Sequence, residues 1–314
     1  WSDKMQDAPL YASSNQLQRR DAALALDSVI PDMNWDEEGE RIMDIGCGTG
    51  DVTSSLLLSS IPVKVSLLQG TDSSLEMVSY AKIHHSGGNL RYTVMDIEKA
   101  TQVRRLFKEG FNKIFSLYCL HWVRDLASAL SNIKELLVEG GEAMVIFLAS
   151  NPSFRMYSIM ATKPKWAKYM KVQLELIISN PPTNHDTIKD VETFIPVYQS
   201  TTSPDTVFRD TMVKSGLQVK RCESKEVSFT FSNDNQAVAA VRAVNPFLGR
   251  IPADLRTEFI AECVATLLLI TNSEPGKIEA RYFSLFKTLW PLTLIFLMMI
   301  AFPRHSKHGR IQEM

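Results

Sequence analysis

The sequence feature that most constrains the fold is a cluster of three glycines, Gly46, Gly48 and Gly50, within five positions. The whole chain of 314 residues has only 14 glycines, fewer than the usual ~7%, so composition does not explain the cluster. It follows a short apolar segment, residues 41–45, and precedes a second one, residues 52–58. Glycines at such a junction allow positive φ and let a ligand lie against bare backbone. The pattern predicts a strand, a ligand-binding turn and a helix.

The spacing of apolar residues alternates between strand and helix through the first half of the chain. Strands are predicted at 41–45, 63–68, 90–95, 113–116 and 142–148, with helices at 52–58, 75–84 and 126–137. Two later segments, 218–231 and 278–286, are predicted as strands, the last of them antiparallel. This alternation predicts an α/β fold with a doubly wound, Rossmann-like, mostly parallel seven-stranded sheet.

The pattern changes after residue 150. Residues 151–205 are rich in Pro, Met, Trp and Tyr, and they predict two or three helices that form a lid over the carboxyl ends of the strands. We expect a core with an N-terminal helical segment in 1–150, the lid and remaining elements of the same domain in 151–286, and an atypical tail in 287–314. An apolar tunnel is expected from the lid residues Phe154, Met156, Tyr157, Ile159, Met160, Trp166, Tyr169, Met170, Leu174 and Ile177.

Composition and charge exclude several classes of protein. With 34 basic and 35 acidic residues the formal net charge is -1, which argues against a nucleic-acid partner. The four cysteines are widely spaced, unlike a secreted disulfide scaffold. No signal peptide is visible at the start. We therefore expect a cytoplasmic protein with reduced thiols.

The segment Thr288–Phe302 carries no charge and is followed closely by basic residues. A spanning helix needs ~20 apolar residues, and Pro291 weakens a continuous helix here. Three interpretations stay open: a buried or poorly ordered segment, which is favoured, weak peripheral association with a membrane, and a true membrane span.

Acidic residues follow the first three predicted strands. Asp44 lies two positions before Gly46, Asp72 ends the second strand, and Asp96 ends the third with Ile97 beside it. A carboxylate at Asp72 can accept both hydroxyls of a ribose, and Asp96 with Ile97 suits an adenine ring. Each feature alone is explained by a tight turn or a helix cap. Together they predict a nucleotide-like cofactor, with NAD as an alternative because it uses the same topology.

This set resembles the class I S-adenosylmethionine (SAM) dependent methyltransferases. The resemblance implies that SAM binds here and leaves as S-adenosyl-L-homocysteine. No metal site is predicted, because the pair His84 and His85 has no acid or cysteine at ligand spacing. The expected cofactor-binding residues are Asp44, Gly46, Cys47, Gly48, Gly50, Asp72, Ser73, Asp96 and Ile97.

Several blocks resemble the juvenile hormone acid methyltransferases of arthropods. They are residues 17–22 (LQRRDA), 118–122 (YCLHW), Asn151-Pro152 and residues 244–247 (VNPF). The resemblance implies methylation of a sesquiterpenoid lipid acid, farnesoic acid or juvenile hormone acid, in juvenile hormone biosynthesis. It also implies that Gln18 and Trp122 hold the substrate carboxylate.

The residues near this carboxylate have alternative interpretations. Gln18 is alternatively a solvated polar residue, Trp122 a core residue, and Tyr11 either a lid residue near the sulfonium or a packing anchor. His121 would be a general base if the substrate were a phenol or other hydroxyl, and is structural or a cofactor contact if the substrate is a carboxylate. A third hypothesis, a catalytically silent lipid-binding scaffold, is disfavoured because a scaffold does not need the bare loop 46–50.

Overall fold

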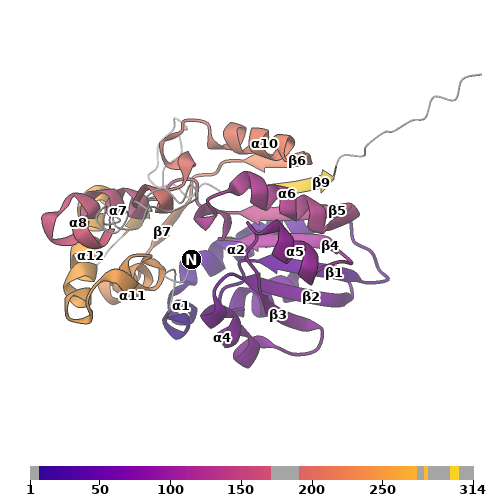
Figure 1. The fold of residues 1–314 in the computed structure, drawn as a ribbon, viewed down its shortest axis with the longest axis horizontal. Coiled ribbons are helices and arrows are strands. Elements are labelled where there is room, and N and C mark those ends of the chain that lie inside the picture. Colours follow the sequence, from indigo (N-terminus) through magenta and orange to yellow (C-terminus); the bar gives the residue numbers. More distant parts are fainter. Residues whose placement is uncertain (1–6, 171–190, 274–278, 282–297, 304–314) are drawn as a thin grey trace, which may run out of the picture.

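The structure is a computed structural model that describes residues 7–170, 191–273, 279–281 and 298–303. Its centre is a seven-stranded sheet in the order β3-β2-β1-β4-β5-β9-β6. The first five strands in this order are mutually parallel, and β9 runs antiparallel to both of its neighbours. The predicted doubly wound α/β fold is confirmed (Figure 1). The strands are β1 (Glu40–Ile45), β2 (Val65–Asp72), β3 (Leu90–Val94), β4 (Phe111–Leu117), β5 (Leu137–Ile146), β6 (Leu217–Glu223) and β9 (Met298–Pro303).

Helices cover both faces of this sheet, as its alternating sequence requires. One face packs against the helices α5 (Ala100–Leu106), α6 (Leu126–Leu136) and α10 (Pro204–Lys214). The other packs against α2 (Gln16–Val29), α4 (Leu75–His85) and the helical segment formed by η2 (Thr53–Leu57) and α3 (Leu58–Ser60). Each face buries its own apolar cluster, so strands enclosed on both sides read as continuous apolar runs.

A third apolar cluster lies outside the sheet and forms the lid. Its helices stand together beside the carboxyl ends of the strands (Figure 1). The first described helix, α1 (Ala8–Ser14), contacts both the lid helix α11 (Asp234–Val244) and α4 of the core. The lid elements are α7 (Pro152–Thr162), α8 (Pro164–Met170), η4 (Val191–Phe194), α11 (Asp234–Val244) and α12 (Arg256–Thr271). Short 3-10 turns connect elements at η1 (Ile30–Asp32), η3 (Leu120–Trp122), η5 (Val197–Ser200), η6 (Leu248–Arg250) and η7 (Ala253–Leu255).

The later strands differ from the prediction. The segment 218–231 is not one strand: β6 ends at Glu223, and a separate strand, β7 (Ser228–Thr230), pairs with β8 (Glu279–Arg281) in a small second sheet. The antiparallel strand of the main sheet is β9, part of the uncharged run 288–302, rather than 278–286. β9 pairs with β5 on one edge and with β6 on the other, a long-range arrangement that the local spacing of apolar residues does not report.

Among the described residues, no helix has both the length and the apolar character that a membrane span requires. Residues 288–297, which make up most of the segment predicted to contact a membrane, lie outside the described residues. The lid residues Leu174 and Ile177 also lie outside them.

Candidate active site

The glycine cluster forms a tight loop at the carboxyl end of β1. Gly46, Gly48 and Gly50 have φ of +78°, +54° and +79°, in the left-handed region that favours glycine. A Cβ atom on Gly46 would lie 2.2 Å from the Cβ of Cys119, which follows β4. Glycine is therefore required at position 46 for the loop to close against the segment that follows β4.

A cavity of about 710 Å³, its open mouth included, lies over this loop. We call it the loop cavity. Three neighbouring strand ends contribute to it, as predicted from the positions of the acids. Six of the predicted cofactor-binding residues line it, together with Tyr11: Gly46, Gly48, Asp72, Ser73, Asp96 and Ile97. Asp44, Cys47 and Gly50 do not line it; Asp44 and Cys47 are buried directly beside the residues that do.

Asp72 is held in place by main-chain groups. Its Oδ2 accepts a hydrogen bond from the N–H of Gly48 at 3.0 Å, and its Oδ1 accepts one from the N–H of Ser74 at 2.8 Å. Ser74 caps α4 with its own hydroxyl. The carboxylate of Asp72 is thus not needed as the helix cap, and it links the glycine loop to the end of β2.

Asp96 occupies the corresponding position after β3. Its Oδ1 accepts from the N–H of Glu98 at 3.1 Å, and its Oδ2 lies 3.4 Å from the Nζ of Lys99. The side chain of Lys99 is 63% exposed, so this ion pair is solvent-screened. Ile97 is buried beside it and provides an apolar wall.

Asp44 is the most deeply buried of the three acids at 1% exposure. Its Oδ2 accepts a 2.6 Å hydrogen bond from the hydroxyl of Thr53, whereas its Oδ1 is buried without a hydrogen-bond partner in the described part of the chain. Burial raises the pKa of Asp44 to about 7; the bond from Thr53 opposes this, and the charges of Asp72 and Asp51 add to it. A buried, unpaired acceptor in an acidic surrounding fits a ligand that brings positive charge and hydrogen-bond donors.

Tyr11 on α1 also lines the loop cavity. Its ring lies 3.4 Å from where a Cβ atom on Gly48 would stand. Burial raises the pKa of its hydroxyl, and the charges of Asp51 and Asp72 raise it further. Tyr11 therefore stays a neutral phenol at physiological pH, able to donate a hydrogen bond but unsuited to act as a base.

Helix α2 ties this loop to the segment after β4. Arg19 pairs with Asp51, just past Gly50, at 2.6 Å. Asp21 is fully buried, pairs with Arg20 at 2.7 Å and accepts a 2.5 Å hydrogen bond from the hydroxyl of Tyr118. Neither Asp21 nor Tyr118 was predicted as a site residue, although both lie in the sequence blocks LQRRDA and YCLHW. Tyr118 also has a positive φ of 66°, which marks a constrained turn at the end of β4.

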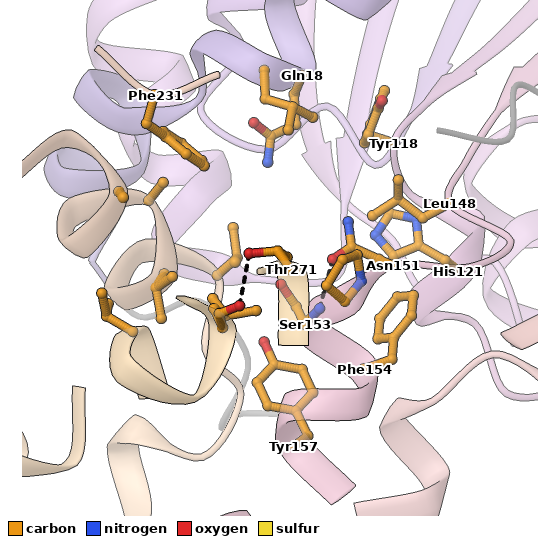
Figure 2. A pocket seen from close by; sticks show the side chains of 18 of the residues that line it. Gln18, Tyr118, His121, Leu148, Asn151, Ser153, Phe154, Tyr157, Phe231 and Thr271 are labelled. Atoms are coloured by element: carbon orange, nitrogen blue, oxygen red, sulfur yellow. Dashed lines mark hydrogen bonds between the residues drawn. The ribbon is translucent and has the colours of Figure 1, made fainter. Parts of the chain in front are cut away.

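A second cavity, which we call the lid cavity, has a volume of about 950 Å³ with its open mouth included. It shares Tyr11, Tyr118 and Trp122 with the loop cavity, so the two cavities meet at these aromatic residues. Figure 2 shows the side chain of Gln18 entering the lid cavity from one wall, with Tyr157 and Thr271 opposite and His121 at the side. Its described wall carries no Asp, Glu, Lys or Arg side chain.

The apolar wall of the lid cavity differs from the predicted tunnel. Of the eight expected lid residues that the structure describes, only Phe154 and Tyr157 line the cavity. Met156, Met160, Trp166 and Met170 are buried in the core of the lid. The wall is completed by α11 and α12, which sequence reasoning did not assign to the site: Ala237, Ala240, Val241, Val244, Val264 and Leu267.

The histidine and tryptophan of the YCLHW block contact each other. Their ring centroids are 4.9 Å apart, and His121 also faces Tyr118 and Phe154. His121 is only 7% exposed and lines the lid cavity but not the loop cavity, whereas Trp122 lines both cavities. Trp122 is therefore placed at the junction of the two cavities, and His121 supports it from the lid side.

The chain is similar in sequence to known methyltransferases. A family model described as a methyltransferase domain matches residues 42–141. The juvenile hormone acid O-methyltransferase of Drosophila melanogaster is 33% identical over 276 residues, 87% of this chain and 86% of that protein. The juvenile hormone acid O-methyltransferase of Bombyx mori is 31% identical over 260 residues, 83% of this chain and 85% of that protein. A solved SAM-dependent methyltransferase from Anabaena variabilis is 13% identical with a TM-score of 0.46, covering 91% of this chain and 86% of that one.

Proposed function

Because the chain belongs to the juvenile hormone acid O-methyltransferase family and uses SAM as its cofactor, we propose that it transfers a methyl group from SAM to the carboxylate of a sesquiterpenoid lipid acid. Farnesoic acid and juvenile hormone acid are the proposed substrates. The observation that carries this proposal is the meeting of an acid-lined cavity with an apolar, uncharged cavity at Tyr11, Tyr118 and Trp122. This arrangement supports a reaction between a polar, cationic donor and an oily acceptor.

The loop cavity is proposed to hold SAM, which supplies a methyl group bound to a positively charged sulfur. The backbone at Gly46 and Gly48 would lie against the ligand, Asp72 would accept the ribose hydroxyls, and Asp96 with Ile97 would contact the adenine. Ser73 would contact the ligand at the cavity wall. The remaining predicted cofactor residues would support the loop without lining the cavity: Asp44, Cys47 and Gly50. The unpaired Oδ1 of Asp44 and the positive φ angles of the glycines support this assignment.

Gln18 and Trp122 are proposed to orient the substrate carboxylate. A carboxylic acid is ionised at neutral pH, so the substrate oxygen is already nucleophilic and needs no general base. The amide of Gln18 has no hydrogen-bond partner among the described residues, and it lines the lid cavity. Neutral donors position an anion without the strong ground-state pairing that a lysine would impose.

The apolar wall of the lid cavity is proposed to bind the hydrocarbon chain and to exclude water from the reacting carboxylate. Burying a farnesyl-sized chain is worth on the order of 10 kcal/mol before binding costs. A wall without charged side chains is therefore sufficient for affinity. Positioning the carboxylate in line with the methyl group is worth several kcal/mol more.

The proposal is tested by methyl transfer from labelled SAM to farnesoic acid, a saturated fatty acid and a phenol. We expect the highest kcat/KM for farnesoic acid, with a rate that stays flat down to about pH 5, because the substrate ionises below that range. Preference for the phenol, with a rate that falls as a histidine protonates, would instead support base catalysis by His121. SAM binding with no transfer to any of the three acceptors would favour the silent lipid-binding scaffold.

The division into a cofactor core at 1–150 and a lid region of the same domain at 151–286 is retained as part of this proposal, while residues 298–303 of the expected tail 287–314 add β9 to the sheet of the core. A cytoplasmic location is also proposed, and weak membrane association through residues 288–302 is kept as the alternative to the place of β9 in the sheet. Fractionation of the full chain beside a chain that stops at Phe286 tests both. Loss of stability in the shortened chain would show that β9 contributes to the core sheet.

A further inference from the structure

We propose that Asn151, at the start of the lid helix α7, is a further positioning residue that donates a hydrogen bond from its side-chain Nδ2 to the substrate carboxylate. This inference rests on the function proposed above and extends its carboxylate-binding site beyond Gln18 and Trp122. Asn151 lines the lid cavity and is only 6% exposed.

The cap of α7 fixes the orientation of this amide. The Oδ1 of Asn151 accepts a 2.8 Å hydrogen bond from the N–H of Ser153, and the N–H of Asn151 is bonded to Gln199 Oε1 at 2.8 Å. With the oxygen committed to the helix, the Nδ2 group must point the other way. Within the described part of the chain it has no hydrogen-bond partner, so a donor in the cavity wall is left for a ligand.

The position is favourable for an anion. Asn151 caps the N-terminus of a helix of 11 residues, where the aligned peptide dipoles place partial positive charge. In Figure 2 the amides of Gln18 and Asn151 enter the lid cavity from two different walls. A carboxylate has two oxygens and about four acceptor sites, so it can accept from both amides at once.

Two other asparagines show that this use of the amide is not a general result of capping. Asn245 also precedes a proline and accepts from the N–H two residues later, but its Nδ2 faces Cys263 Sγ inside the protein at 3.9 Å. Asn233 caps α11 with an exposed side chain. Among these three, Asn151 is the one that is buried as a residue and also lines a cavity.

The test uses Asn151→Asp, because aspartate keeps the capping oxygen but replaces the donor with a negatively charged acceptor. Binding of farnesoic acid and of its neutral methyl ester is measured with S-adenosyl-L-homocysteine present, together with SAM affinity and the thermal midpoint. We expect the acid to bind at least tenfold more weakly and the ester to bind within twofold of the unchanged protein. Asn233→Asp is the matched control and should alter neither.

A second variant, Asn151→Ser, keeps a capping oxygen and adds no charge, but it lacks the longer amide donor of asparagine. It too should weaken binding of the acid more than that of the ester. Equal weakening of acid and ester, or no change in either, would overturn the role of Asn151. If the unchanged protein methylates no lipid acid, the proposed function fails; if it does and both variants keep its KM, only this inference fails.

Discussion

The two ends of the parallel sheet both bury acidic side chains, but they treat them differently. At the amino end, Lys113 lies 3.1 Å from Glu40 and 3.8 Å from Glu142, and all three side chains are at most 4% exposed. At the carboxyl end, Asp44 and Asp72 accept hydrogen bonds from a hydroxyl and from main-chain N–H groups. The amino end balances its charge within the protein, whereas the carboxyl end concentrates negative charge beside a cavity.

This difference shows that an unpaired oxygen alone does not identify a site. Glu40 Oε2 also lacks a hydrogen-bond partner among the described residues, yet Lys113 compensates the charge of that carboxylate through the other oxygen. At the carboxyl end the charges of Asp51 and Asp72 are close enough to raise the pKa of Tyr11. Buried acids that perturb one another beside a cavity are the stronger indication of a ligand.

The largest effect is expected from Lys113→Met, which removes the cation at the amino end. The buried carboxylate of Glu40 would lose the cation that pairs with it, while Glu142 would keep Lys220 at 3.8 Å. Breaking a buried ion pair typically costs about 3–5 kcal/mol of unfolding free energy. Urea denaturation measures this change. The control is Lys165→Met, because Lys165 pairs with Glu258 on the surface with both side chains about half exposed, and such pairs contribute about 1 kcal/mol or less. Equal effects of the two substitutions would contradict the comparison.

At the carboxyl end, Asp72→Asn should instead weaken SAM binding. The substitution removes a charged acceptor of two main-chain N–H groups at the rim of the loop cavity, and such bonds are worth about 1.5–3 kcal/mol each. We expect a rise in the dissociation constant of roughly 10- to 100-fold, measured by calorimetric titration. Asp125→Asn, at an exposed helix cap that does not line the cavity, should leave the constant unchanged. A loss of stability without a loss of SAM affinity would assign Asp72 a purely structural role.

The roles proposed for Gln18 and Trp122 predict a smaller, selective effect. Gln18→Ala and Trp122→Ala should each lower kcat/KM for the lipid acid by roughly tenfold or more, because each removes one hydrogen bond to an anion, while SAM affinity is largely kept. Gln16→Ala is the control on the same helix, since the amide of Gln16 is bonded to the main chain at Ser13. Loss of SAM binding equal to the loss of turnover would contradict the assignment.

The core of this fold and the acids of the loop cavity were predictable because their signals are local. The glycine loop, Asp72 and Asp96 each follow a strand directly, and the carboxyl ends of parallel strands meet at one edge. Gly46, Asp72 and Ile97, which the sequence predicts to lie at neighbouring strand ends, line one cavity.

The lid cavity and the last strand were less predictable because they depend on long-range packing. Apolar faces of α11 and α12 look alike whether they pack in a core or line a cavity, so Val241 and Leu267 carried no signal of their role. The hydrogen bond between Tyr118 and Asp21 joins residues 97 positions apart. Pairing of β9 with β5 and β6 likewise joins distant segments, and the uncharged run that contains β9 was interpreted as a tail.

The smallest expected effect is a partial release of a proton on SAM binding. It tests whether Asp44, at the carboxyl end of the sheet, responds to the ligand. Its pKa is raised from 3.8 to about 7, so between these values the folded protein holds a proton that the unfolded chain has lost. Asp44 therefore lowers the stability of the ligand-free protein as pH rises through this window. A cationic ligand favours the ionised carboxylate and lowers its pKa, so binding near pH 7 should release up to roughly half a proton. Calorimetry in buffers of different ionisation enthalpy measures this release, and Asp44→Asn should abolish it. If the unchanged protein and the Asp44→Asn variant release the same number of protons, the titrating group is another residue and Asp44 does not respond to the ligand.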